Sequence, residues 1–193
     1  MNTIQIDQEA LVWLNHALVG RSAFLDKLIV FLGVYLIYAL PVVLILLWFF
    51  VKKQQRTLAF SFFGTLISWL VITKSIVPHI WFRARPDFAA IGARELIFHR
   101  PDYSFPSDHA TALFAITFGL YLFGYRKAAN WFLLGSIVIC IARVTLGIHF
   151  PLDIIGGIVS AAIGVALVKM LEGPLDKYIW RPFSRFLKTI YLT

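Results

Sequence analysis

Two short segments combine the side chains that phosphoryl transfer requires. One is residues 106–109, which read Pro-Ser-Asp-His, and the other places His149 after Arg143 and five residues, with Asp153 four positions further on. An imidazole can attack phosphorus or move a proton, a carboxylate can orient that imidazole, and a guanidinium can hold phosphate oxygens. Together the segments predict transfer of a phosphoryl group through a covalent histidine intermediate.

Each segment lies where an apolar run meets a polar loop. Ser107 precedes one such run and is a predicted N-cap, which places His109 in the first helical turn. Pro151 suits the first position of a helix, so Asp153 is expected in the first turn of the next one. Free backbone N–H groups and the helix dipole attract phosphate at such termini. Arg85, in the loop 83–106, supplies a second guanidinium.

The elements that must position these residues are membrane helices. Of the 193 residues, 60% are hydrophobic and 15% are charged, whereas a soluble domain has about 25% charged residues. Runs of about 20 apolar residues can cross a bilayer, and five such spans are predicted at 28–51, 57–81, 107–125, 130–147 and 151–171. Segments 1–20 and 174–193 are predicted to be amphipathic helices on the membrane surface. The expected fold is an all-α integral membrane bundle, forming one domain over 1–193.

Charge asymmetry orients this bundle. Lys and Arg are more frequent on the side that holds loops 52–56 and 126–127 and the C-terminal segment, which predicts that this side is cytoplasmic. The loop 83–106, both histidine segments and the N-terminus would then face outward. A nucleic-acid partner is not expected, because the basic residues are divided between two sides and flank membrane spans. The sequence does not indicate an oligomeric state.

The motifs resemble the signature of the type 2 phosphatidic acid phosphatase superfamily of membrane lipid phosphatases. That signature has three parts: lysine, six residues and Arg-Pro; then Pro-Ser-Gly-His; then Ser-Arg, five residues, His, three residues and Asp. Arg85-Pro86 matches the end of the first part, and residues 106–109 match the second with Asp108 in place of glycine. The third part is matched in spacing, with Ala142 in place of serine.

The resemblance covers residues 57–171 and is greatest to the bacterial undecaprenyl-diphosphatase branch. It implies that His149 attacks phosphorus, that Asp153 orients His149, and that His109 protonates the leaving group and then activates water. It also implies that the phosphate oxygens are held by Arg85, Arg143 and Ser107, with no metal or cofactor.

The family lysine has no direct counterpart. The residue in register is Pro78, and Lys74, one helical turn earlier, is the candidate replacement because its long stem can extend toward the interface. His79 and Arg83 are rivals, and Lys74 could instead simply reach water. Asp108 either favours the helix start through its charge or takes part in catalysis. His99, with its neighbours, could contact a diphosphate, although a structural role is expected.

The implied function is hydrolysis of undecaprenyl diphosphate to the monophosphate and inorganic phosphate, in a bacterial cell membrane with the site facing outward. This reaction would recycle the carrier lipid of cell-wall synthesis. Phosphatidate or phosphatidylglycerophosphate is the alternative substrate. A metal-dependent hydrolase using both histidines, Asp108 and Asp153 is disfavoured, because two arginines beside the site would repel the cation. A non-enzymatic lipid-binding or transport protein is the alternative of another class.

Overall fold

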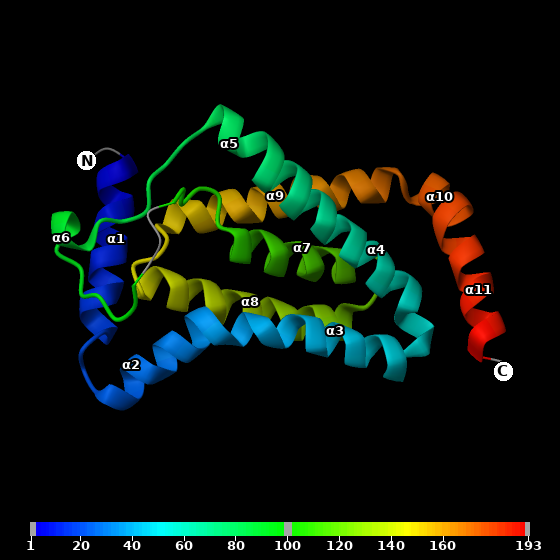
Figure 1. The fold of residues 1–193 in the computed structure, drawn as a ribbon, viewed down its shortest axis with the longest axis horizontal. Coiled ribbons are helices and arrows are strands. Elements are labelled where there is room, and N and C mark those ends of the chain that lie inside the picture. The colour runs from blue at the N-terminus through cyan, green and yellow to red at the C-terminus, as the bar shows by residue number, and fades with distance from the viewer. Residues whose placement is uncertain (1–2, 99–101, 192–193) are drawn as a thin grey trace.

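The computed structural model describes residues 3–98 and 102–191, and most of its long helices run along the long axis of the molecule, with one long segment crossing them at a slant (Figure 1). Helix α1 (Thr3–Leu18) crosses one end of this bundle. The next segment combines α2 (Ala23–Val30), π and 3-10 turns over 31–38, and α3 (Ala39–Phe50). A short 3-10 turn (Lys52–Gln54) leads into α4 (Gln55–Leu66), which continues as a π-helical stretch (Ile67–Ile76) and α5 (Val77–Ile80).

The motif-bearing part of the chain follows a loop that contains the short helix α6 (Phe88–Ile91). Helices α7 (Asp108–Leu122), α8 (Arg126–Thr145) and α9 (Pro151–Met170) then run back and forth through the bundle (Figure 1). The chain continues through α10 (Glu172–Leu175), a π turn (Asp176–Trp180) and α11 (Arg181–Tyr191) at the end opposite α1. The expected all-helical membrane fold is therefore confirmed, since the described residues form helices and no named strand.

Four helical segments of the described chain are long and apolar enough to cross a membrane, namely Ala23–Phe50, Lys52–Ile80, Arg126–Thr145 and Pro151–Met170. The remaining expected span contains α7, which has 15 residues and is about 22 Å long at 1.5 Å per residue. A hydrocarbon core is about 30 Å thick. Helix α7 packs against α4, α8 and α9, and nine of its 15 residues are buried. The count of five spans and the interfacial placement of α1 and α11 remain predictions.

Glycines allow the central helices to approach closely. A Cβ added at Gly119 of α7 would lie 2.6 Å from the Cα of Ser61, and one at Gly157 of α9 would lie 2.8 Å from the carbonyl oxygen of Ser107. Small residues at such contacts let membrane helices pack backbone to backbone. The start of α9 is thereby held against the start of α7, which bears His109.

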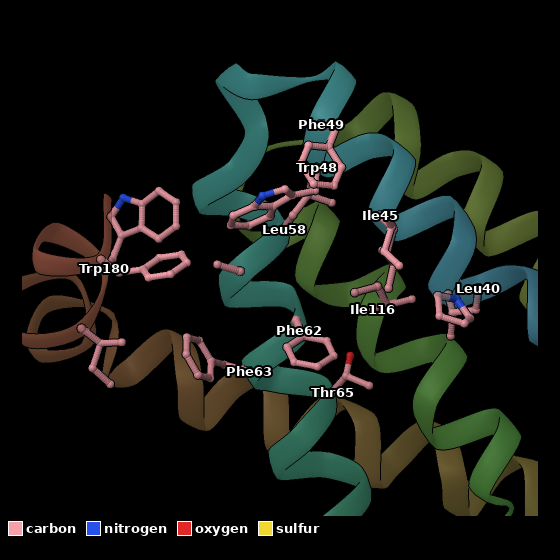
Figure 2. Close-up of a pocket in the computed structure, with 15 residues that line it drawn as sticks. Leu40, Ile45, Trp48, Phe49, Leu58, Phe62, Phe63, Thr65, Ile116 and Trp180 are labelled. Carbon is pink, nitrogen blue, oxygen red and sulfur yellow. The ribbon is translucent and has the colours of Figure 1, made fainter. Parts of the chain in front are cut away.

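Helix α3 is packed much less tightly, and none of its residues is buried. A cavity of about 680 Å³ separates it from α4 and the C-terminal segment, toward the end of the bundle opposite α1 (Figure 2). Apolar side chains line this cavity almost throughout, including Leu40, Ile45, Leu58 and Phe62. At its far end the ring centroids of Trp48 and Trp180 lie 6.3 Å apart. The largest hollow beside α3 therefore contains none of the candidate site residues.

Candidate active site

His149 lies in the short connection between α8 and α9 and is 2% exposed. Its Nδ1 is 3.0 Å from the carbonyl oxygen of Ser104, and its Nε2 is 3.2 Å from an Nη2 of Arg143. A carbonyl can only accept a hydrogen bond and a guanidinium can only donate one, so these partners assign the proton to Nδ1. The lone pair of Nε2 is therefore directed toward Arg143, as a nucleophile beside a phosphate site requires.

Burial lowers the pKa of His149 to about 4 from its ordinary value of 6.5, and the positive charge of Arg143 adds to this effect. The neighbouring Asp153 acts in the opposite direction but does not outweigh them. The ring is therefore neutral at neutral pH, because its pKa lies well below the pH of the surroundings.

Asp153 occupies the first turn of α9, where its Oδ2 accepts a hydrogen bond from the Phe150 N–H at 2.7 Å. The hydroxyl of Ser104 donates to the same oxygen. Nδ1 of His149 is 3.6 Å from Oδ2, which is too long for a hydrogen bond. We expected the carboxylate itself to accept the imidazole proton, but the backbone of Ser104 takes that place, and Asp153 holds Ser104.

Arg83 supports this arrangement from behind. One of its Nη atoms donates to Oδ1 of Asp153 at 3.1 Å, and the other pairs with Asp7 of α1 at 2.5 Å. Asp7 also accepts the N–H of Leu152 at 2.8 Å. Arg83 is thus engaged by two buried carboxylates, and helix α1 is tied to the start of α9. Sequence reasoning had weighed Arg83 only as a phosphate ligand, and had not identified Ser104 or Asp7, which belong to no motif.

Two arginines border His149. Arg143, on the last turn of α8, donates from Nη1 to the carbonyl of Gly33 at 2.8 Å, while its buried Nε has no partner among the described residues. Arg85 donates to the carbonyl of Ile148 at 2.9 Å and pairs with Asp102. The two guanidinium groups lie close enough for their charges to repel. Such a pair favours a multiply charged anion between them.

His109 lies in the first turn of α7, as predicted, and makes no side-chain hydrogen bond among the described residues. Its ring is within electrostatic reach of Arg143, His149 and Arg85. Ser107 is the N-cap of α7, and its backbone N–H donates to the carbonyl of Asp153 at 3.0 Å. Two helix N-termini therefore meet at the two histidines.

Lys74, the first candidate for the missing lysine, pairs with the residue before His109. Its Nζ is 2.5 Å from Oδ2 of Asp108 and 2.8 Å from the hydroxyl of Tyr103. The exposed His79 instead contacts the carbonyl oxygen of Ser75 within its own helical segment, and Pro78 is the second residue of the short helix α5. The expected contact of His99 lies outside the described residues.

The proposed metal ligands are not brought together. Among the described residues, no three or more His, Cys, Asp or Glu side chains form a group that could hold a metal ion. The structure instead brings the neutral imidazole of His149 beside Arg143 and places Arg143, Arg85 and His149 within electrostatic reach of His109, and such groups can bind and transfer a phosphoryl group.

Similarity to known proteins covers most of the chain. The family model described as "PAP2 superfamily" matches residues 57–173. The undecaprenyl-diphosphatase BcrC of Bacillus subtilis is 34% identical over 177 residues, which make up 91% of this chain and 87% of that protein. Phosphatidylglycerophosphatase B of the same organism is 27% identical over an alignment 182 positions long, which covers 86% of this chain and 79% of that protein. The crystal structure of Aquifex aeolicus LpxE superposes with a TM-score of 0.68 at 23% identity, covering 86% of this chain and 95% of that chain.

Proposed function

Since this chain belongs to the PAP2 superfamily and is a membrane lipid phosphatase, we propose that its substrate is undecaprenyl diphosphate. The products would be undecaprenyl monophosphate and inorganic phosphate. The relative of 34% identity that is named undecaprenyl-diphosphatase supports this choice. We further propose that the chain resides in a bacterial inner membrane with the site facing outward, where the spent carrier lipid of cell-wall synthesis would be recycled.

The proposed reaction has two steps. Nε2 of His149 attacks the terminal phosphorus, and the bond from that phosphorus to the bridging oxygen breaks. His109 gives its proton to the bridging oxygen, which leaves with the lipid. A water molecule, deprotonated by His109, then attacks the phosphohistidine, releasing inorganic phosphate and restoring the free imidazole.

The observation that carries this mechanism is the hydrogen bonding of His149. Its Nδ1–H donates to a backbone carbonyl at 3.0 Å, and its Nε2 remains an acceptor beside Arg143 at 3.2 Å. When a phosphate replaces Nε2 of His149 as the partner of Arg143, the guanidinium holds the phosphate oxygens. The lone pair of Nε2 then already points toward the phosphorus. Arg85, Ser107 and the N-termini of α7 and α9 add positive potential where the transition state is most negative.

The experiment is phosphate release by the purified chain in lipid nanodiscs, with undecaprenyl diphosphate, phosphatidate and phosphatidylglycerophosphate compared at equal surface concentration. The proposal expects the diphosphate to be hydrolysed fastest, in the presence of excess chelator. His149→Ala should abolish turnover and leave no acid-labile phosphoenzyme, whereas His109→Ala should slow turnover while still allowing that phosphoenzyme to form. Good turnover of phosphatidate with none of the diphosphate would contradict the substrate. Function unchanged in His149→Ala would favour a transport or lipid-binding role.

Phosphatidylglycerophosphate is retained as a second candidate on one observation, the 27% identity to a phosphatidylglycerophosphatase across 86% of the chain. The same site residues would serve, because the attacked group is again a terminal phosphate. The comparison of the three lipids decides between these substrates.

A further inference from the structure

Beside His109 is a cluster of four polar or aromatic side chains to which the steps above give no role. Lys74 contacts Asp108 at 2.5 Å and Tyr103 at 2.8 Å, and the indole N–H of Trp69 donates to the other carboxylate oxygen at 3.3 Å. The ammonium also lies 5.0 Å from the centre of the Tyr103 ring. Three chain segments thus converge to hold one lysine at the edge of the site.

This lysine still has capacity to bind. An ammonium has three N–H donors, and two of those of Lys74 are used by Asp108 and Tyr103. The side chains of Lys74 and Asp108 are 34% and 31% exposed, so the pair is open on one side. Trp69 and Lys74 both lie on the π-helical stretch Ile67–Ile76, and such interruptions of a helix are frequent at functional sites.

Lys74 lies beside the proposed proton donor, because its partner Asp108 is the residue before His109 in the first turn of α7. Phosphoryl transfer places the attacking and leaving oxygens, or their equivalents, roughly in line on opposite faces of phosphorus. The charges that act most strongly on His149, the nucleophile, are those of Arg143, Arg85 and Asp153. His109, the proton donor to the leaving group, is additionally within reach of Lys74. A leaving group that takes its proton from His109 would therefore carry its negative charge toward the ammonium of Lys74.

We propose that Lys74 binds the second phosphate of a lipid diphosphate, the phosphate that leaves with the lipid, and that Asp108 and Tyr103 position it. This inference rests on the proposed function, and it attributes the protein's preference for lipid diphosphates to Lys74. When the bond to the bridging oxygen breaks, its electron pair adds negative charge to the departing lipid phosphate. The ammonium stabilises that charge while His109 supplies the proton. A lipid monophosphate leaves as an alcohol and offers Lys74 no second phosphate.

The test compares kcat/KM for farnesyl diphosphate and farnesyl monophosphate, which share one tail and differ by one phosphate. Lys74→Met should lower the value for the diphosphate by roughly 10- to 100-fold, as for loss of a charged hydrogen bond, and change that for the monophosphate little. Lys74→Arg should retain most of the diphosphate turnover. Lys169→Met is the matched control, because Lys169 also pairs with a carboxylate at 2.5 Å and approaches an aromatic ring, at 5.3 Å, but away from the site.

The role of Asp108 is tested by a double-mutant cycle. Asp108→Asn should lower the diphosphate-to-monophosphate ratio in the wild-type background and leave it unchanged in the Lys74→Met background, because a positioning residue acts only through the group it holds. Equal losses for both substrates in Lys74→Met, or no loss, would overturn the inference while leaving the proposed function intact. A wild-type chain that hydrolyses the monophosphate but not the diphosphate would overturn both.

Discussion

The titration of His149 links the chemistry of the site to the stability of the fold. Burial holds its pKa at about 4 in the folded chain, against 6.5 when unfolded. Between these values the unfolded chain binds a proton that the folded chain does not, so the free energy of unfolding falls as the pH decreases. At 1.36 kcal/mol per pKa unit, the stabilisation is fully present above pH 6.5 and about 3 kcal/mol of it is lost by pH 4.

The measurement is the free energy of unfolding in detergent micelles from pH 7.5 to 3.5, for the wild-type chain and for His149→Gln. The difference between the two curves isolates this residue, because every other titrating group is shared. We expect the wild-type chain to lose about 3 kcal/mol more than the variant across this interval. Parallel curves would show that His149 titrates normally in the fold, and would refute the claim that the nucleophile is kept neutral by burial. The acid limb of kcat/KM should likewise fall below pH 5 rather than near 6.5.

Two further variants test the support of the site. Arg83→Met leaves the buried carboxylates of Asp7 and Asp153 without their shared cation, so we expect a loss of about 3–5 kcal/mol in unfolding free energy. Arg181 pairs with Asp176 but is itself 66% exposed, so Arg181→Met should cost at most about 1 kcal/mol. Equal effects of the two variants in thermal unfolding would contradict this reasoning. Gly157→Ala would place a methyl group 2.8 Å from a backbone oxygen at the start of α7. We therefore expect the free energy of unfolding to fall by about 1–3 kcal/mol and kcat to decrease. A variant with normal kcat would show that the starts of α7 and α9 can move apart without affecting the site.

The helix starts could be predicted from the sequence because their signals are local. Ser107 and Pro151 indicate the beginnings of α7 and α9 within a residue, and the placement of His109 and Asp153 in the first turns follows. The apolar runs likewise predicted helical spans. The status of α7 could not be predicted, because its burial among three neighbours depends on packing that a hydropathy profile does not contain.

The partners of the site residues were harder to predict. Ser104 contacts His149 across 45 residues, and Asp7 contacts Leu152 across 145. No spacing rule reaches that far, since these contacts exist only once the loop and α1 have folded onto the end of the bundle. The sequence placed Arg83 near the site as a possible phosphate ligand. That it pairs with two carboxylates instead depends on the folded positions of those carboxylates, which the sequence does not give.

Helix α3 is packed so loosely that the side chains of the protein leave an apolar cavity unfilled beside it. This helix has no buried residue and lies beside an apolar hollow of about 680 Å³, although its partly buried side chains Leu40, Leu44, Leu47 and Trp48 pack against the core. In a bilayer we therefore expect lipid tails to enter this hollow and to complete the packing of α3. The position of the first spanning segment should depend on the thickness and order of the bilayer, whereas the interlocked helices α7 and α9 keep their spacing in any solvent that preserves the fold.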